Sequence, residues 1–141
     1  MALLLIMANR AEQIAVTFAD IYEAATNVHR GLGAKTEAGF SEACFQMALA
    51  AELVASQREV VREVPYYCKT LKKRITVGHV RFDLVYRNFI LEIKSYRTKS
   101  RSSLPQTLHA QLAGYKLLLR PGEVLVAVLF WKNGVDVFEY K

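Results

Sequence analysis

The chain has 141 residues, of which 52% are apolar and 23% charged, and these proportions are typical of one globular domain. Its ten Pro and Gly residues exclude a collagen-like or low-complexity chain. The net charge is +6, and residues 69–101 hold ten basic and only two acidic residues, which leaves about −2 for the remainder. A basic segment of this kind favours an anionic partner.

The two cysteines, Cys44 and Cys68, are too few for a disulfide framework or a structural zinc site, so we expect reduced, buried thiols. The apolar opening, residues 1–7, lacks a cationic region and is far shorter than the ~20 residues that span a bilayer. We therefore expect an intracellular protein without a membrane partner, cytoplasmic or, in a eukaryotic or viral source, nuclear. Residues 1–141 are expected to form a single domain, with 1–8 as a flexible or dispensable N-terminus.

Two helices are predicted in the first third of the chain. From about Ala11 to Gly31 apolar residues recur at spacings of three and four, which is typical of an amphipathic helix. A polar loop follows, and the stretch from Phe40 to about Ser56 favours a second helix. The apolar residues of this second helix occupy most of its circumference, which predicts a largely buried helix.

Three strands should follow, because the pattern changes to β-branched and aromatic runs. They are predicted at Glu59–Lys69, Ile75–Arg87 and Phe89–Tyr96, with turns at Leu71–Arg74 and Arg87-Asn88.

The last third of the chain predicts a basic, Ser-rich loop, a helix and a hairpin. The loop covers residues 97–104, and the helix begins at Pro105 and continues through Leu118. The hairpin pairs Val124–Lys132 with Val135–Tyr140 across a turn at Asn133-Gly134. The element order is then ααβββαββ, which favours an α/β fold with a mixed sheet and helices on both faces.

A two-residue loop at Arg87-Asn88 places Asp83 opposite Glu92, with Cβ atoms about 4.5–5.5 Å apart. Facing like charges are destabilising, so a cation should lie between them, and Lys94 is on the same face. Two carboxylates at this separation suit a hard divalent cation such as Mg²⁺. By alternation, the opposite face carries Phe82, Leu84, Leu91 and Ile93.

Two alternatives to a metal site stay open at this point. Asp83, Glu92 and Lys94 could form a solvated salt-bridge ladder, which contributes little to stability. Glu42 lies on the apolar stripe of the second predicted helix, where a carboxylate needs a partner. It could instead be a first-turn glutamate that the helix dipole favours.

Several short motifs resemble one known family. Residues 39–45 resemble the GxxExxY motif and residues 28–33 its VHxxLG segment, and that family belongs to the PD-(D/E)XK nuclease superfamily. In the same order, residues 78–84 resemble the strand that bears the metal aspartate, 92–94 the ExK signature, and 111–115 the QxxxY helix of RecB-like nucleases. The resemblance covers about residues 20–140.

The chain departs from this pattern in three places. Phe45 replaces the Tyr of GxxExxY, Phe82 stands where the superfamily has Pro, and residues 34–38 form a short insertion. None of these changes removes a ligand, but the insertion puts the placement of Glu42 relative to the hairpin in question.

The resemblance implies a restriction-endonuclease-like three-layer fold and phosphodiester hydrolysis with Mg²⁺, for which Mn²⁺ can substitute. The metal ligands it implies are Asp83, Glu92 and the Ile93 carbonyl, with Glu42 as a further ligand directly or through water. Lys94 would position or deprotonate the attacking water and stabilise developing negative charge. The remaining implied site residues are Gln111, which would orient substrate or nucleophile, and Tyr115, which would contact phosphate or brace the site. Tyr115 could equally be a core aromatic at helical spacing from Leu108 and Leu112.

The basic run after the ExK signature fits contact with nucleic-acid phosphates and binding that falls steeply with salt. Its cations are Lys94, Arg97, Lys99 and Arg101. A solvated basic loop is the alternative, and the same alternative applies to the cluster at 72–74. His79 shares the predicted face of Asp83 and is expected near the site.

These observations favour a metal-dependent nuclease that acts on nucleic acid, DNA in particular. The alternatives are a non-catalytic nucleic-acid-binding or accessory protein with the same fold, and a structural Asp-Lys-Glu cluster in a protein that binds another protein. The oligomeric state stays open, a homodimer included, because Trp131 and Phe138 could belong to the core or to a dimer edge.

Overall fold

The computed structural model describes residues 2–33, 40–96 and 105–141, with side chains from Asn9 onward in the first range. The helices are α1 (Ala2–Leu32), α2 (Glu42–Glu52) and α3 (Gln106–Lys116), and the strands are β1 (Gln57–Cys68), β2 (Lys73–Tyr86), β3 (Phe89–Ser95), β4 (Val124–Trp131) and β5 (Gly134–Glu139). The predicted order ααβββαββ is confirmed. The predicted basic loop, with Arg97, Lys99 and Arg101, lies outside the described residues.

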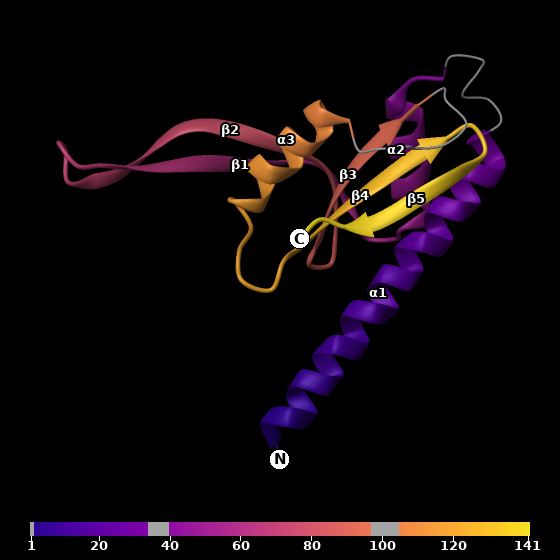
Figure 1. The fold of residues 1–141 in the computed structure, drawn as a ribbon, viewed down its shortest axis with the longest axis horizontal. Helices are drawn as coiled ribbons and strands as arrows, with labels where there is room; N and C mark the ends of the chain where they lie inside the picture. Colours follow the sequence, from indigo (N-terminus) through magenta and orange to yellow (C-terminus); the bar gives the residue numbers. More distant parts are fainter. Residues whose placement is uncertain (1, 34–39, 97–104) are drawn as a thin grey trace.

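The five strands form one mixed sheet in the order β1-β2-β3-β4-β5. Every neighbouring pair is antiparallel except β3 and β4, which run parallel because α3 crosses over between them. Helices α1 and α2 cover one face of the sheet and α3 covers the other (Figure 1). The expected three-layer α/β architecture is confirmed.

Each face of the sheet has its own apolar cluster. On the first face, Ile21 and Val28 of α1 and Phe45 of α2 pack against strand residues that include Leu91. On the second, α3 contributes the buried side chains Leu108 and Leu112. Strand β4 is buried on both sides, which explains its unbroken apolar sequence. Trp131 is buried in the α3 cluster, and Phe138 is partly buried against it.

The two N-terminal helices differ from their predicted bounds. Helix α1 begins at Ala2 rather than at Ala11, and α2 ends at Glu52 rather than at Ser56. The expectation that α2 is largely buried is wrong, because only Phe45 and Leu49 of this helix are buried. It lies in an outer layer and packs on the sheet through one side.

Among helices of the described residues, none is long and apolar enough to cross a membrane.

The cysteines also differ from the expectation of buried thiols. Both are free, as predicted, but each is only half-buried. Cys44 lies in the first turn of α2, where its Sγ is 3.5 Å from the Ser41 Oγ, and Cys68 ends β1 in the protruding hairpin.

The β2–β3 turn has the predicted two-residue loop, since Tyr86 pairs with Phe89. Arg87 adopts a positive φ of 55° in this loop, a conformation that non-glycine residues rarely take. Its guanidinium donates to Thr17 Oγ1 at 3.0 Å and lies 3.5 Å from the Asp20 carboxylate. These contacts with α1 explain why an arginine is accommodated here.

The final hairpin is shifted by one residue from the prediction. Trp131 pairs with Gly134, so the loop is Lys132-Asn133 rather than Asn133-Gly134. In this register the Trp131 side chain is buried, and its indole donates to Asp136 Oδ2 at 3.0 Å.

The β1–β2 hairpin extends well beyond the rest of the sheet (Figure 1). The turn at its tip covers residues 69–72, two residues earlier than predicted. The register shifts between Val64 and Pro65, so the ladder is irregular part-way along the hairpin. We call residues 64–82 the arm.

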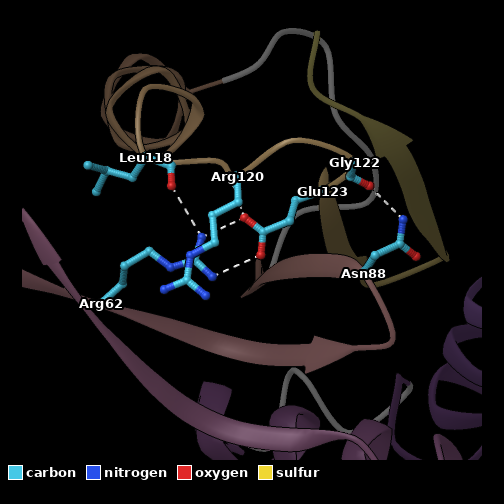
Figure 2. Close-up of polar contacts among 6 residues, drawn as sticks. All are labelled: Arg62, Asn88, Leu118, Arg120, Gly122 and Glu123. Carbon is cyan, nitrogen blue, oxygen red and sulfur yellow. Dashed lines mark hydrogen bonds and ion pairs between the residues drawn. The ribbon is translucent and has the colours of Figure 1, made fainter.

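Side-chain hydrogen bonds hold the base of the arm against the connection between α3 and β4 (Figure 2). Arg62 of β1 donates to both carboxylate oxygens of Glu123 and, at 3.2 Å, to the carbonyl of Leu118. On the other side of this connection, Asn88 of the β2–β3 turn donates to the Gly122 carbonyl at 2.7 Å. Neither contact follows from a local pattern in the sequence.

The C-terminal end of α1 explains the VHxxLG segment in physical terms. The His29 Nε2–H donates to the carbonyl of Trp131 at 3.0 Å, which ties the helix to the end of β4. Gly33 lies directly against the His29 ring, and a Cβ atom at this position would overlap the imidazole. Glycine is therefore required after the helix by close approach rather than by its φ angle.

Candidate metal centre

The candidate site is centred on β3, where two charged residues alternate with core residues. Leu91 and Ile93 pack into the α1–α2 cluster, so Glu92 and Lys94 point to the opposite face. The Glu92 residue is only 2% exposed, whereas Lys94 is partly exposed. A carboxylate this deeply buried is not part of a solvated ladder, so that alternative for Glu92 is wrong.

Asp83 reaches the same place from β2 by replacing a backbone interaction. The described β2–β3 ladder extends from Tyr86 only to the pair Leu84–Leu91. Beyond it, Asp83 Oδ2 accepts a hydrogen bond from the backbone N–H of Ile93 at 2.8 Å. The carboxylate therefore lies beside β3, close to Glu92 as the hairpin geometry predicts.

One part of the predicted face alternation is wrong. Leu84 packs with Leu91, but Phe82 packs into the opposite cluster under α3. The register of β1 and β2 skips the pair Glu59–Asp83, and Glu59 has a φ of 53°. Strict alternation fails at this point because the ladder is interrupted on both sides of Asp83.

Lys94 is a cation between two carboxylates, but these are Glu92 and Glu42 rather than the predicted pair Asp83 and Glu92. Its Nζ is 3.3 Å from Glu92 Oε1 and 3.7 Å from Glu42 Oε1. The second carboxylate oxygen of Glu42 accepts from the backbone N–H of Ser95 at 3.3 Å. Glu42 is the first residue of α2, where the helix dipole favours a carboxylate. Its side chain therefore has this helix-terminal position and also contacts the site.

The electrostatics of this cluster favour another cation. Burial, and then the nearby Asp83 carboxylate, raise the pKa of Glu92 to about 8. Burial also raises the pKa of Asp83, although its bond from Ile93 opposes the shift. Burial lowers the pKa of Lys94, but the Glu92 and Glu42 carboxylates outweigh this and raise it above its ordinary value. One lysine therefore faces three carboxylates.

The residues fit a divalent ion in one further respect. The Glu92 Oε2 atom is buried and accepts no hydrogen bond from the described residues. A buried carboxylate oxygen without a partner is costly, and a cation would remove that cost. Within 9–33, 40–96 and 105–141, no three Asp, Glu, His or Cys side chains are grouped closely enough to hold a metal by themselves. The lysine between Glu92 and Glu42 explains the separation of these carboxylates.

Comparison with known proteins identifies the family. A family model of the PD-(D/E)XK nuclease superfamily matches residues 15–129, which is most of the chain. The chain belongs to this superfamily. No curated protein matches it.

One solved structure, described as the crystal structure of SSO0001, matches the chain with a TM-score of 0.50 and 21% sequence identity. The match covers 67% of this chain and 46% of that one, so the chain spans about half the length of that protein. At this identity the similarity concerns the fold alone.

Gln111 and Tyr115 lie on α3, on the same face of the sheet as Glu92. The Gln111 Nε2–H donates to the Tyr115 hydroxyl at 2.9 Å, and this hydroxyl donates to the Arg81 carbonyl at 3.2 Å. The tyrosine ring meets Phe82 edge-on at 5.1 Å. Burial, and then the Glu92 carboxylate, raise the pKa of Tyr115. The ring thus serves the core of this PD-(D/E)XK domain while the hydroxyl lies near the cluster.

Glu59 lies on β1 and His79 on β2, the strand that also carries Asp83. Glu59 of β1 is a further carboxylate near Asp83, whose pKa it raises, and the sequence reasoning did not single it out. On either side of Glu59, the residue numbers of each β1–β2 pair add up to 142. Knowledge of this register would have placed Glu59 opposite Asp83. His79 is exposed and pairs with Glu63, four residues along β2 from Asp83, or about 13 Å at ~3.3 Å per residue. This places His79 outside the cluster.

Proposed function

We propose that this PD-(D/E)XK protein is a Mg²⁺-dependent nuclease that hydrolyses phosphodiester bonds in DNA. Within the superfamily, its motifs favour the GxxExxY type with a RecB-like QxxxY helix. The observation that carries the proposal is the buried Glu92 carboxylate, which faces Asp83, contacts Lys94 and has one oxygen without a donor among the described residues.

Asp83, Glu92 and the Ile93 carbonyl would hold the metal ion, with Glu42 as a further ligand directly or through water. Oxygen ligands of this kind suit Mg²⁺, and Mn²⁺ is a substitute. When bound, such an ion polarises a phosphoryl oxygen and lowers the pKa of bound water. Asp83 is held in place for this role because its other interaction, with the Ile93 N–H, fixes the carboxylate against β3.

Lys94 would position or deprotonate the attacking water. Although burial opposes the shift, the Glu92 and Glu42 carboxylates raise its pKa above the ordinary value, which favours the ammonium form in the metal-free protein. The ammonium group can donate to the attacking water and to a non-bridging phosphate oxygen, and it stabilises the negative charge that develops during the reaction. Gln111 would orient the substrate, and the Tyr115 hydroxyl would brace this side of the site.

The predicted nucleic-acid contacts after Lys94 involve Arg97, Lys99 and Arg101. They would bind phosphates without reading bases, because a basic, Ser-rich run offers charge but no base-specific arrangement.

A non-catalytic nucleic-acid-binding protein is the second candidate. The local excess of positive charge in residues 69–101 would serve a binder equally well. The buried carboxylates favour the nuclease, because facing acids raise the cost of binding a polyanion and bring no benefit to a protein that only binds.

The test is cleavage of single- and double-stranded DNA and RNA, linear and circular, with Mg²⁺, Mn²⁺ or EDTA. Metal-dependent cleavage should be lost in Asp83→Asn and Lys94→Ala and retained in Glu12→Gln, a change at an exposed carboxylate on α1. Salt-sensitive binding without cleavage in any metal would contradict the nuclease and support the binding protein. Cleavage of RNA alone would contradict the choice of DNA.

A further inference from the structure

The arm concentrates positive charge away from the candidate metal centre. Residues 64–82 contain five Lys or Arg and no Asp or Glu, in a chain whose total net charge is +6. Three of these cations, Lys72, Lys73 and Arg74, are consecutive and exposed at the tip. The tip protrudes from the body of the protein (Figure 1), and the nearest acidic residue of the hairpin, Glu63, is paired with His79, closer to the sheet.

The arm also exposes large apolar side chains. Tyr66 and Tyr67 are each 56% exposed, and Leu71 and Val77 are similarly exposed. Neighbouring residues of a strand point to opposite faces, so each face of the hairpin presents a tyrosine ring. Tyr67 is paired across the hairpin with Arg74, which places an aromatic ring and a cation side by side. These four large apolar side chains of the arm are thus more than half exposed.

The surface of the arm is continuous with the candidate site. An open groove of about 550 Å³ separates the arm from α3. Val64, Pro65 and Val80 line it on the arm side, and Gln111 and Tyr115 line it on the helix side. A chain bound along the arm could therefore pass through the groove and reach residues assigned to the site.

We infer that the arm is a second nucleic-acid-binding surface, which holds a single-stranded segment next to the scissile phosphate. Lys72, Lys73 and Arg74 neutralise phosphates, and Tyr67, whose cross-strand partner is Arg74, stacks on an unpaired base. Interleaved cations and aromatic rings are the features by which proteins bind single strands without sequence preference. This inference rests on the proposed function, since it names how the same substrate is held.

The first test compares binding of two charge-matched variants of the full chain. In EDTA, which prevents metal-dependent cleavage, a labelled single-stranded DNA oligonucleotide is titrated with wild type, Lys72→Ala/Lys73→Ala and Arg10→Ala/Lys141→Ala. Arg10 and Lys141 are exposed and lie outside the arm. The arm variant should bind about tenfold more weakly, with a slope of log K against log salt smaller by about 1.4. Equal losses in the two variants, or none in either, would overturn the inference.

The second test concerns stacking. Tyr67→Ala should weaken binding of the oligonucleotide about tenfold, whereas Tyr67→Phe, which keeps the ring, should bind like wild type. The thermal unfolding midpoint of both variants is measured alongside, because a loss of affinity without a loss of stability excludes misfolding of the arm. Equal affinity of Tyr67→Ala and Tyr67→Phe would overturn the stacking role.

The same proteins distinguish failure of the arm from failure of the nuclease. Cleavage by wild type with Mg²⁺, and unchanged binding and cleavage by Lys72→Ala/Lys73→Ala, would overturn the arm alone. Weaker binding by that variant, in a protein that never cleaves, would support the arm and contradict the nuclease. A change in oligomeric state by light scattering, with nucleic-acid binding unchanged, would identify the arm as a contact between copies and overturn the inference.

Discussion

Arg62 donates to both carboxylate oxygens of Glu123, at 2.6 and 2.8 Å, and the two side chains are only 12% and 15% exposed. The guanidinium also lies over the Phe82 ring, 5.1 Å from its centroid. This bidentate pair joins the edge strand β1 to the loop that precedes β4. The base of the arm is thereby fixed although its tip protrudes.

Glu123→Gln should therefore destabilise the protein by about 2 kcal/mol at pH 7, because a charged, poorly exposed hydrogen-bonded pair is broken. The bond from Arg62 lowers the pKa of Glu123 below its ordinary 4.5, so this stabilisation is complete above pH 4.5 and is lost as the pH falls further. Urea unfolding at pH 7 and pH 3 measures it. The difference between wild type and variant should shrink at pH 3, and Glu12→Gln should change little at either pH.

In the metal-free protein, Glu92 should make the free energy of unfolding decrease as the pH rises, which is opposite to the effect of Glu123. Its folded pKa of about 8 lies above the ordinary 4.5, so the folded state binds a proton that the unfolded state has lost. Stability should fall as the pH rises from 4.5 to 8, by at most about 1.4 kcal/mol per pH unit. Urea unfolding in EDTA should show this slope in wild type and a flatter curve in Glu92→Gln. Identical curves would contradict the buried, protonated carboxylate.

Magnesium should stabilise the folded protein, because an ion that binds only the native state adds RT ln(1 + [L]/Kd) to its stability. At a hundredfold excess over Kd the gain is about 2.7 kcal/mol. The melting temperature of wild type should rise with Mg²⁺, whereas Asp83→Asn and Glu92→Gln should show little change. An equal rise in all three proteins would indicate that the ion binds elsewhere.

Removal of Lys94 should separate metal binding from cleavage. Its Nζ lies between Glu92 and Glu42 and competes with a divalent ion for these carboxylates. Lys94→Ala should thus bind Mg²⁺ at least as tightly as wild type, while its cleavage rate falls about 10²–10³-fold through loss of charge stabilisation. Calorimetric titration with Mg²⁺ and a single-turnover cleavage assay test the two parts. Weaker Mg²⁺ binding by the variant would show that the lysine organises the ligands instead.

Two glycines at the end of α1 provide a matched pair for packing. Gly33→Ala should destabilise the protein by about 1–3 kcal/mol, because its Cβ would displace the His29 ring from the Trp131 carbonyl. Gly31→Ala meets no atom within 4 Å and should stabilise the helix by about 0.5–1 kcal/mol. Thermal or urea unfolding measures both. A loss of stability in Gly31→Ala would indicate that any side chain added at this helix end is destabilising, and that overlap with the His29 ring is not the cause.

The elements that sequence reasoning placed well are those governed by local patterns. The hairpin register around Arg87-Asn88 follows from a two-residue turn, and it brings Asp83 and Glu92 together without any knowledge of the rest of the fold. The β3–α3–β4 crossover follows from alternation of strand and helix patterns. The family resemblance extended these patterns to the placement of Glu42, which contacts Lys94.

The errors arise where distant parts of the chain decide the outcome. Phe82 joins the α3 cluster because the β1–β2 ladder is interrupted beside Asp83. Strict alternation of side chains along a strand does not predict such an interruption. Similarly, the partner of Arg62 lies 61 positions away, so neither periodicity nor spacing indicates it. The exposed side of α2 depends on which layer the helix occupies.

The turn at Arg87-Asn88 has a consequence for the order in which the protein folds. Asp83 and Glu92 are separated by a short hairpin, whose closure costs little chain entropy, so these two carboxylates can meet early. The parallel pairing of β3 with β4 must instead close a loop that contains α3, and α2 must dock from a distant part of the chain. The repulsive pair should thus form before Glu42 reaches Lys94, and a divalent ion present during refolding is expected to accelerate the step that brings β2 and β3 together.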